Sequence, residues 1–110
     1  MPEARHGLST EDLSLLDKVF SRFPGVQSVV LFGSRAKGTH RAGSDVDLAL
    51  KGDIGRERLV EISHHLNEET LLPYRFDLVA YDSIENVALL EHIDRIGFEL
   101  HTKRTETHTL

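Results

Sequence analysis

The chain has 110 residues, a net charge of −5 and no cysteine. Its length allows one domain with one hydrophobic core, and the lack of cysteine excludes a disulfide framework or a zinc–thiolate site and fits a cytoplasmic setting. The negative charge argues against stable binding of duplex nucleic acid through its phosphates, and no apolar run is long enough to cross a membrane.

The first half of the chain predicts one helix and two strands. Ser9 is expected to cap the helix, with Asp12 as the acid of a capping box and Leu8 and Leu13 as a hydrophobic staple. The predicted elements are a helix ending at Pro24-Gly25, a strand over about 26–32, a helical turn and loop over 34–43, and a strand over about 45–50.

The second half predicts helix, strand and helix. The expected features are a turn over 51–53 with Asp53 as a cap, a helix burying Leu59, Ile62 and Leu66, a strand over about 75–80, a helix capped by Asp82 or Ser83 and ended by Gly97, and a small strand or extended tail over 98–100. Residues 1–101 are interpreted as a single domain and residues 102–110 as a flexible tail, because the latter have almost no apolar content.

This order predicts an α/β (α+β) fold, with a small mixed sheet, helices packed on one face and the other face open. The second and third strands are joined through a helix, so they are expected to be parallel with a right-handed crossover.

Three aspartates are predicted to share the open face. Asp45 and Asp47 are two positions apart on a strand and therefore point the same way, while Val46 points into the core. Asp77 joins them if its strand is a parallel neighbour. Carboxylates aimed at one place repel each other unless a cation lies between them, and Mg²⁺ prefers such oxygen ligands together with phosphates.

The loop before these acids offers phosphate contacts. Gly33 and Ser34 follow the apolar run of the first strand, where a bare backbone and a hydroxyl let a phosphate approach closely. The loop that follows is basic, and Arg35 and Lys37 are candidate phosphate contacts. The alternatives are a plain turn for the Gly-Ser pair and a solvated loop for the basic residues.

At these residues the chain resembles the minimal nucleotidyltransferase (MNT) domain of the DNA polymerase β superfamily. The resemblance rests on residues 31–38, 44–49 and 76–79, and it extends over about residues 10–101. It implies that Asp45, Asp47 and Asp77 hold two Mg²⁺ ions and serve catalysis, and that the nucleotide ATP is bound by Gly33, Ser34, Arg35, Lys37 and Ser44.

The resemblance also implies a partner. Small members of this family are often antitoxins of HEPN/MNT toxin–antitoxin modules, and some transfer AMP from ATP to a tyrosine of the helical HEPN ribonuclease toxin. A homodimer or a hetero-oligomer with the toxin is expected, and the acceptor hydroxyl is expected to come from the partner.

Two other functions remain open. One is a non-catalytic antitoxin that neutralises the toxin by complex formation, and the other is an enzyme that adenylylates a small-molecule hydroxyl. The seven histidines are interpreted as surface residues, and either Tyr74 or Tyr81 as a residue near the nucleotide or as rim packing.

Overall fold

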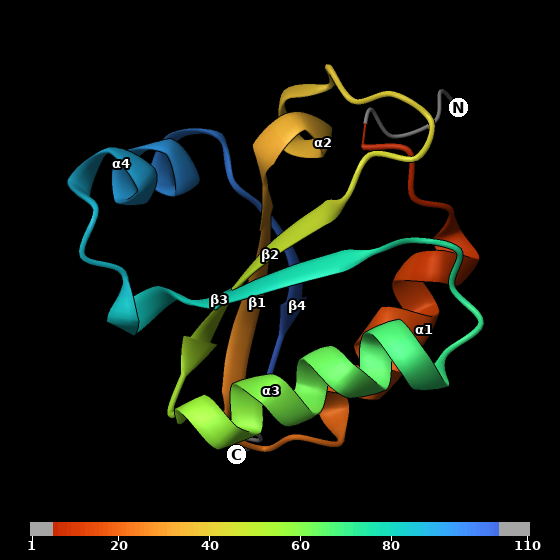
Figure 1. Ribbon diagram of the computed structural model, residues 1–110, viewed down its shortest axis with the longest axis horizontal. Helices are drawn as coiled ribbons and strands as arrows, with labels where there is room; N and C mark the ends of the chain where they lie inside the picture. Colours follow the sequence, from red (N-terminus) through yellow and green to blue (C-terminus); the bar gives the residue numbers. More distant parts are fainter. Residues whose placement is uncertain (1–5, 104–110) are drawn as a thin grey trace, which may run out of the picture.

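A computed structural model describes residues 6–103, which form one sheet and the helices around it (Figure 1). The elements in chain order are α1 (Thr10–Ser21), β1 (Val26–Phe32), α2 (Gly33–Lys37), β2 (Val46–Gly52), α3 (Arg56–His64), a π-helical turn (His65–Glu69), β3 (Phe76–Ala80), a 3₁₀ turn (Tyr81–Ser83), α4 (Val87–Ile96) and β4 (Phe98–Thr102). No helix within the described residues is both long enough and apolar enough to span a membrane.

In the described part of the chain the sheet has four strands, in the order β3-β2-β1-β4. β1 is antiparallel to both of its neighbours, β2 and β4, whereas β2 and β3 are parallel. The expected mixed sheet and the parallel pairing of the two acidic strands are therefore confirmed. The parallel pair brings the start of β3 beside the start of β2, which is the end of the sheet where α2 lies (Figure 1).

The main core lies between the sheet and the helices α1 and α3. Alternate residues of β2 point into it, as period-2 alternation requires, and Val46, Leu48 and Leu50 are at most 1% exposed. The buried residues of this core that come from the two helices and the π-helical turn are Leu16, Val19, Phe20, Ile62 and Leu66.

A second, smaller core covers part of the opposite face. Ile93 of α4 packs there against Val30 and Ala49, with Leu89 at the edge of the cluster. The expectation that all helices lie on one face, leaving the acidic face open, is therefore corrected, because α4 covers the part of that face over β1 and β2. Figure 1 shows α4 on the side of the sheet away from α1 and α3.

The predicted helix starts are right for α1 and wrong for α3 and α4. Ser9 and Asp12 form the predicted capping box. α3 is preceded by Gly55 rather than by Asp53, with no side-chain cap, and α4 is capped by Asn86, whose side chain accepts from the Leu89 N–H, rather than by Asp82 or Ser83.

The predicted ends also shift by a few residues. α1 ends at Ser21, before the predicted stop at Pro24. β4 continues to Thr102, and the Lys103 N–H donates to the Gln27 carbonyl, so the chain is still tied to the sheet one residue later. Most of the predicted tail, residues 104–110, lies outside the described residues.

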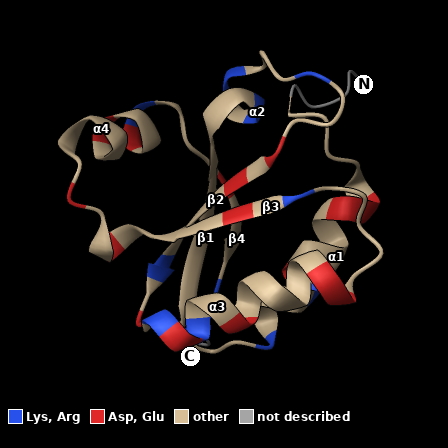
Figure 2. Ribbon diagram, in the orientation of Figure 1, with Lys and Arg blue, Asp and Glu red and all other residues tan. Residues whose placement is uncertain are grey.

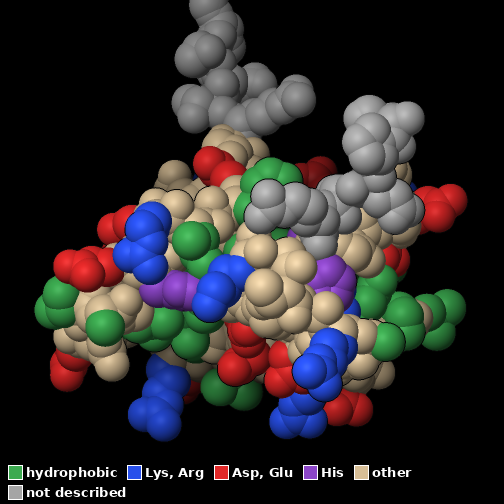
Figure 3. Space-filling model, turned by 90° about the horizontal axis from the view of Figure 1, so that it is seen from above, with side chains coloured by type: hydrophobic (Ala, Val, Ile, Leu, Met, Phe, Trp, Pro, Cys, Tyr) green, Lys and Arg blue, Asp and Glu red, His purple; other side chains and the backbone are tan. Residues whose placement is uncertain are grey.

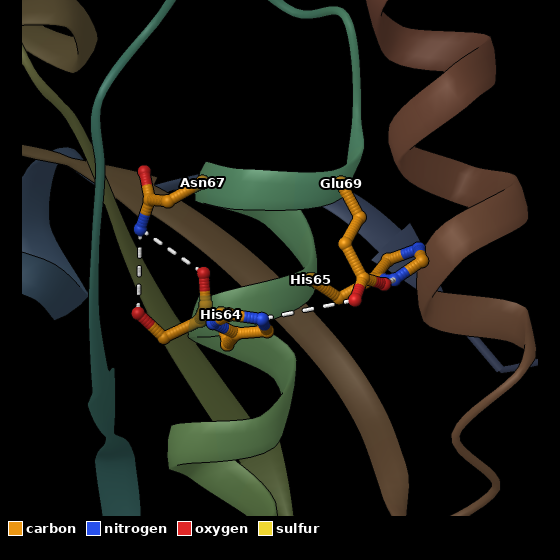
Figure 4. A network of polar contacts seen from close by, with 5 residues as sticks. His64, His65, Asn67 and Glu69 are labelled. Atoms are coloured by element: carbon orange, nitrogen blue, oxygen red, sulfur yellow. Dashed lines mark hydrogen bonds and ion pairs between the residues drawn. The ribbon is translucent and has the colours of Figure 1, made fainter.

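Asn67, in the π-helical turn after α3, ties that turn to the start of β3. Its amide nitrogen donates to the Phe76 carbonyl, and its amide oxygen accepts from the Phe76 N–H at 2.8 Å. The same nitrogen donates to Ser63, one helical turn earlier, and Glu69 pairs with the two adjacent histidines (Figure 4). The Asn67 side chain thus takes the place of a neighbouring strand for the first residue of β3.

Candidate functional site

Two of the three predicted acids lie opposite each other on neighbouring strands. Asp47 of β2 and Asp77 of β3 are paired in the parallel register. Their side chains leave the sheet on the face away from the main core, because Val46 and Phe76, the preceding residues, are buried in that core. Asp45 lies one residue before β2 and is exposed. Figure 2 shows acidic positions at the starts of both strands, side by side.

The electrostatics of this group centre on Asp47. Burial raises the pKa of its carboxyl above the usual range, and the nearby charges of Asp77 and Asp45 raise the same pKa further. All three effects disfavour the ionised form of Asp47. A positive charge placed among the three carboxylates would relieve this cost.

Gly33 packs directly against this carboxylate. It begins α2 immediately after β1, with a positive φ of 79°. A Cβ at this position would overlap the Asp47 side chain. Glycine is therefore required here twice, once for the backbone conformation and once for the close approach of Asp47.

The α4 helix contributes a residue that the sequence did not single out. The Gly33 N–H donates to Nε2 of His92 at 3.2 Å, and the imidazole contacts the Phe32 ring edge-on. A lone histidine among charged helix residues carries no sequence signal, and only the packing of α4 on the second face brings it to this place.

Arg35 lies inside the fold and is only 4% exposed. Its guanidinium donates to the carbonyl oxygens of His6 and Ser44 and lies over the ring of Tyr74, 5.0 Å from the centroid. These contacts tie the segment before α1 and the loop before β2 to α2. Arg35 therefore has a structural role in this fold, and the phosphate contact predicted for it stays a prediction.

The remaining predicted nucleotide contacts lie on α2 and in the loop directly before Asp45, and they differ in setting. Lys37 is exposed on α2, and Ser34 is half-buried in the first turn of the same helix. The Ser44 hydroxyl accepts from the Arg41 N–H at 2.8 Å and so closes the turn before Asp45. In the view from above, acidic, basic and histidine side chains are interspersed with hydrophobic ones on the visible face (Figure 3).

Two of the histidines are buried rather than superficial. His6 is 3% exposed and accepts from the Leu8 N–H through Nδ1, and burial lowers its pKa, as does the Arg35 charge. His101 is 7% exposed and pairs with Asp17 at 2.6 Å. The interpretation of all histidines as surface residues is therefore wrong for these two.

Both tyrosine hydroxyls are bound to aspartates other than the three of the candidate site. The Tyr74 hydroxyl donates to Asp12 and the Tyr81 hydroxyl donates to Asp94, both at 2.6 Å. These bonds favour the rim-packing interpretation over a place beside a nucleotide.

The donor set fits a hard divalent cation by its chemistry and by its backbone register. Within residues 6–103, no three histidine or acidic side chains converge into a ready-made metal cluster. The Asp47–Asp77 pairing nevertheless sets two carboxylates on adjacent strands, about 4.8 Å apart at the backbone, with a third acid two positions before the first. Oxygen ligands of this kind suit Mg²⁺.

The fold is shared with solved toxin–antitoxin structures. A chain from a crystal structure of a toxin–antitoxin with AMP-PNP superposes with a TM-score of 0.68 at 24% identity, covering 87% of this chain and 76% of that one. A chain of the toxin–antitoxin MntA-HepT gives 0.65 at 20% identity, with 86% and 74% covered. A chain of the tri-AMPylated Shewanella oneidensis HEPN toxin in complex with MNT antitoxin gives 0.62 at 21% identity, with 83% and 70% covered. At these identities the likeness shows the fold alone.

The family to which the chain belongs follows from a match of its sequence to a family model. No curated protein matches the chain. The family described as "Polymerase beta, Nucleotidyltransferase" matches residues 15–106, which include both strands of the acidic group and the glycine that packs against it. The chain belongs to this nucleotidyltransferase family.

Proposed function

We propose that this protein is a Mg²⁺-dependent nucleotidyltransferase that transfers AMP from ATP to a protein hydroxyl, a tyrosine of a cognate HEPN ribonuclease toxin, and thereby acts as an antitoxin in the cytoplasm. In this reaction the hydroxyl oxygen bonds to the α-phosphorus, the bond from the α-phosphorus to the β-phosphate breaks, and pyrophosphate leaves. The observation that carries the proposal is the pairing of Asp47 with Asp77 on adjacent parallel strands, with Gly33 against the first of these carboxylates.

Each residue of the group has a role in this reaction. Asp45, Asp47 and Asp77 would hold two Mg²⁺ ions, which when bound neutralise the triphosphate and make the acceptor hydroxyl more acidic. Gly33 and Ser34 would orient the phosphates through their backbone N–H groups at the start of α2.

Asp77 and Lys37 have the exposure that their roles require. Asp77 is exposed on β3, an edge strand, so an acceptor hydroxyl can approach it from outside the sheet and lose its proton there. Lys37 is exposed on α2, where its ammonium group can meet a phosphate oxygen.

A protein acceptor is supported by what the relatives of similar fold are bound to. One of these structures contains a tri-AMPylated HEPN toxin with an MNT antitoxin, and another is a toxin–antitoxin with the ATP analogue AMP-PNP. Transfer to a toxin hydroxyl uses the nucleotide, the acids and the partner together, whereas a purely binding antitoxin has no need of three neighbouring carboxylates.

The test is the intact mass of the HEPN partner after incubation with this protein, ATP and Mg²⁺. We expect the wild type to add one or more AMP units and the Asp47→Asn variant to add none while keeping its fold. Asp53→Asn removes the same charge from an exposed turn and should match the wild type. A stable, neutralised complex without mass gain would assign the protein as a binding antitoxin, and activity in Asp47→Asn would refute the assigned site.

A further inference from the structure

The first backbone donor after β1 already has a partner in the protein. The Gly33 N–H donates to Nε2 of His92, with 3.2 Å between the two nitrogens. The imidazole is held in place by its edge-on contact with Phe32, at 6.1 Å between ring centroids, and by its neighbour Ile93, which is 2% exposed in the second core. This contact therefore joins α4 to the acidic group.

The hydrogen bond fixes the chemical form of the ring. Because the backbone N–H must donate, Nε2 carries no proton, and a neutral imidazole has its proton on Nδ1. A ring nitrogen with its lone pair thus occupies the direction in which the Gly33 amide would meet an anionic oxygen.

The imidazole is not needed to aim this amide. Gly33 is fixed by its own backbone, with φ of 79° between the end of β1 and the first turn of α2, and by the packing of Asp47 against its Cα. The effect of His92 on a ligand is therefore competition for the donor and not preorganisation of it.

We propose that His92 satisfies the Gly33 N–H in the free protein, competes with the nucleotide for this donor, and yields it to a phosphate oxygen when the nucleotide binds. The inference rests on the proposed function, since it concerns the same phosphate site. A phosphate oxygen displaces the imidazole because hydrogen bonds to ionised acceptors are roughly twice as strong as neutral ones. Because the hydrogen bond between Gly33 and His92 must break when the nucleotide binds, His92 lowers the affinity of the protein for the nucleotide.

Two variants of His92 separate competition from direct contact. His92→Phe keeps a flat ring on Phe32 but has no acceptor, and His92→Gln keeps an acceptor of similar reach. With AMP-PNP and Mg²⁺ in calorimetry, we expect His92→Phe to lower Kd roughly two- to tenfold, which corresponds to one net hydrogen bond, and His92→Gln to stay near the wild-type Kd. An unchanged or higher Kd for His92→Phe overturns the inference.

A second measurement uses the wild type alone and does not depend on the variants folding. An N–H···N bond transmits a scalar coupling between its two nitrogens, so ¹⁵N NMR should show a Gly33–His92 coupling in the free protein. Saturation with AMP-PNP and Mg²⁺ should abolish it, and a coupling that persists at saturation refutes the exchange.

Failure of the two proposals can be told apart. If neither the wild type nor His92→Phe binds AMP-PNP, the proposed function fails and the inference fails with it. If both bind with equal Kd, only the role of His92 fails.

Discussion

Replacing Asp47 by asparagine should stabilise the fold at neutral pH while it removes activity. Burial and the charges of Asp77 and Asp45 raise the pKa of Asp47, so the native state holds its proton more tightly than the unfolded chain does. A group of this kind favours the folded state below its unfolded pKa, about 3.9, and this advantage is lost as the pH rises through the raised native pKa. At pH 7 the ionised carboxylate therefore costs stability.

The size of the effect follows from the register. Asp47 and Asp77 are opposite each other on strands about 4.8 Å apart, and two like charges at about 5 Å repel by about 0.8 kcal/mol in a water-like medium and about 3 kcal/mol at an effective dielectric constant of 20. Asp77 is exposed, so the lower end applies, and we expect a gain of about 1 kcal/mol for Asp47→Asn. For a domain near this size, that corresponds to roughly 4–8 °C in Tm.

The assay is thermal unfolding in a chelating buffer at pH 7 and at about pH 3.5, the latter just below the unfolded pKa. Asp47→Asn should have a higher Tm than the wild type at pH 7. The difference should vanish in acid, where the carboxyl of Asp47 is protonated and residue 47 is neutral in both proteins. Asp53→Asn makes the same change in net charge at an exposed turn and should show no gain. An equal gain from both variants, or a gain that persists in acid, would refute the argument.

Two further substitutions test the packing around the acids. Gly33→Ala should lower the free energy of unfolding by more than the roughly 1–2 kcal/mol that a positive φ costs an L-residue, because the new Cβ also meets the Asp47 carboxylate. Gly43 has a φ of 88° with open space around it, so Gly43→Ala measures the backbone cost alone. Equal losses for the two variants in urea unfolding would contradict the steric clash with Asp47. Asn67→Leu should lower the free energy of unfolding by about 1–3 kcal/mol in the same assay, because it leaves the N–H and the carbonyl of Phe76 without the Asn67 side chain as a partner. Hydrogen exchange of the Phe76 amide should become faster, and an unchanged exchange rate would contradict the prediction.

Local patterns predicted most of the fold. Strand β1 agrees with its predicted bounds, and the parallel pairing of β2 with β3 follows from the helix that joins them. That pairing is what brings Asp77 beside Asp47. The start of α4 was missed because Asp82 and Ser83 are as good N-caps in sequence as Asn86, which the structure uses. The start of α3 was missed because this helix begins after Gly55 without any side-chain cap, although Asp53 is the better capping residue in sequence.

The packing of α4 on the second face of the sheet was not predicted, although the sequence contains a signal for it. Val29-Val30-Leu31 and Leu48-Ala49-Leu50 are apolar at consecutive positions, which indicates strands buried on both faces rather than on one. The apolar side chains along one side of α4 pack against this second apolar face of the sheet. Arg35 could not have been placed from sequence, since a guanidinium suits phosphates and backbone carbonyls equally well.

The position of β3 at the edge of the sheet has a consequence for local unfolding. β3 has five residues and, within residues 6–103, pairs with β2 alone, while its first residue is held on the other side by Asn67. Edge elements with few partners open at a lower free energy than the strands at the centre of a sheet. Opening of β3 would carry Asp77 away while Asp45, Asp47 and Gly33 stay on the central strands and α2. The acidic group is therefore complete only while this strand is docked, and a partner that covers β3 would raise the fraction of molecules in which all three acids are together.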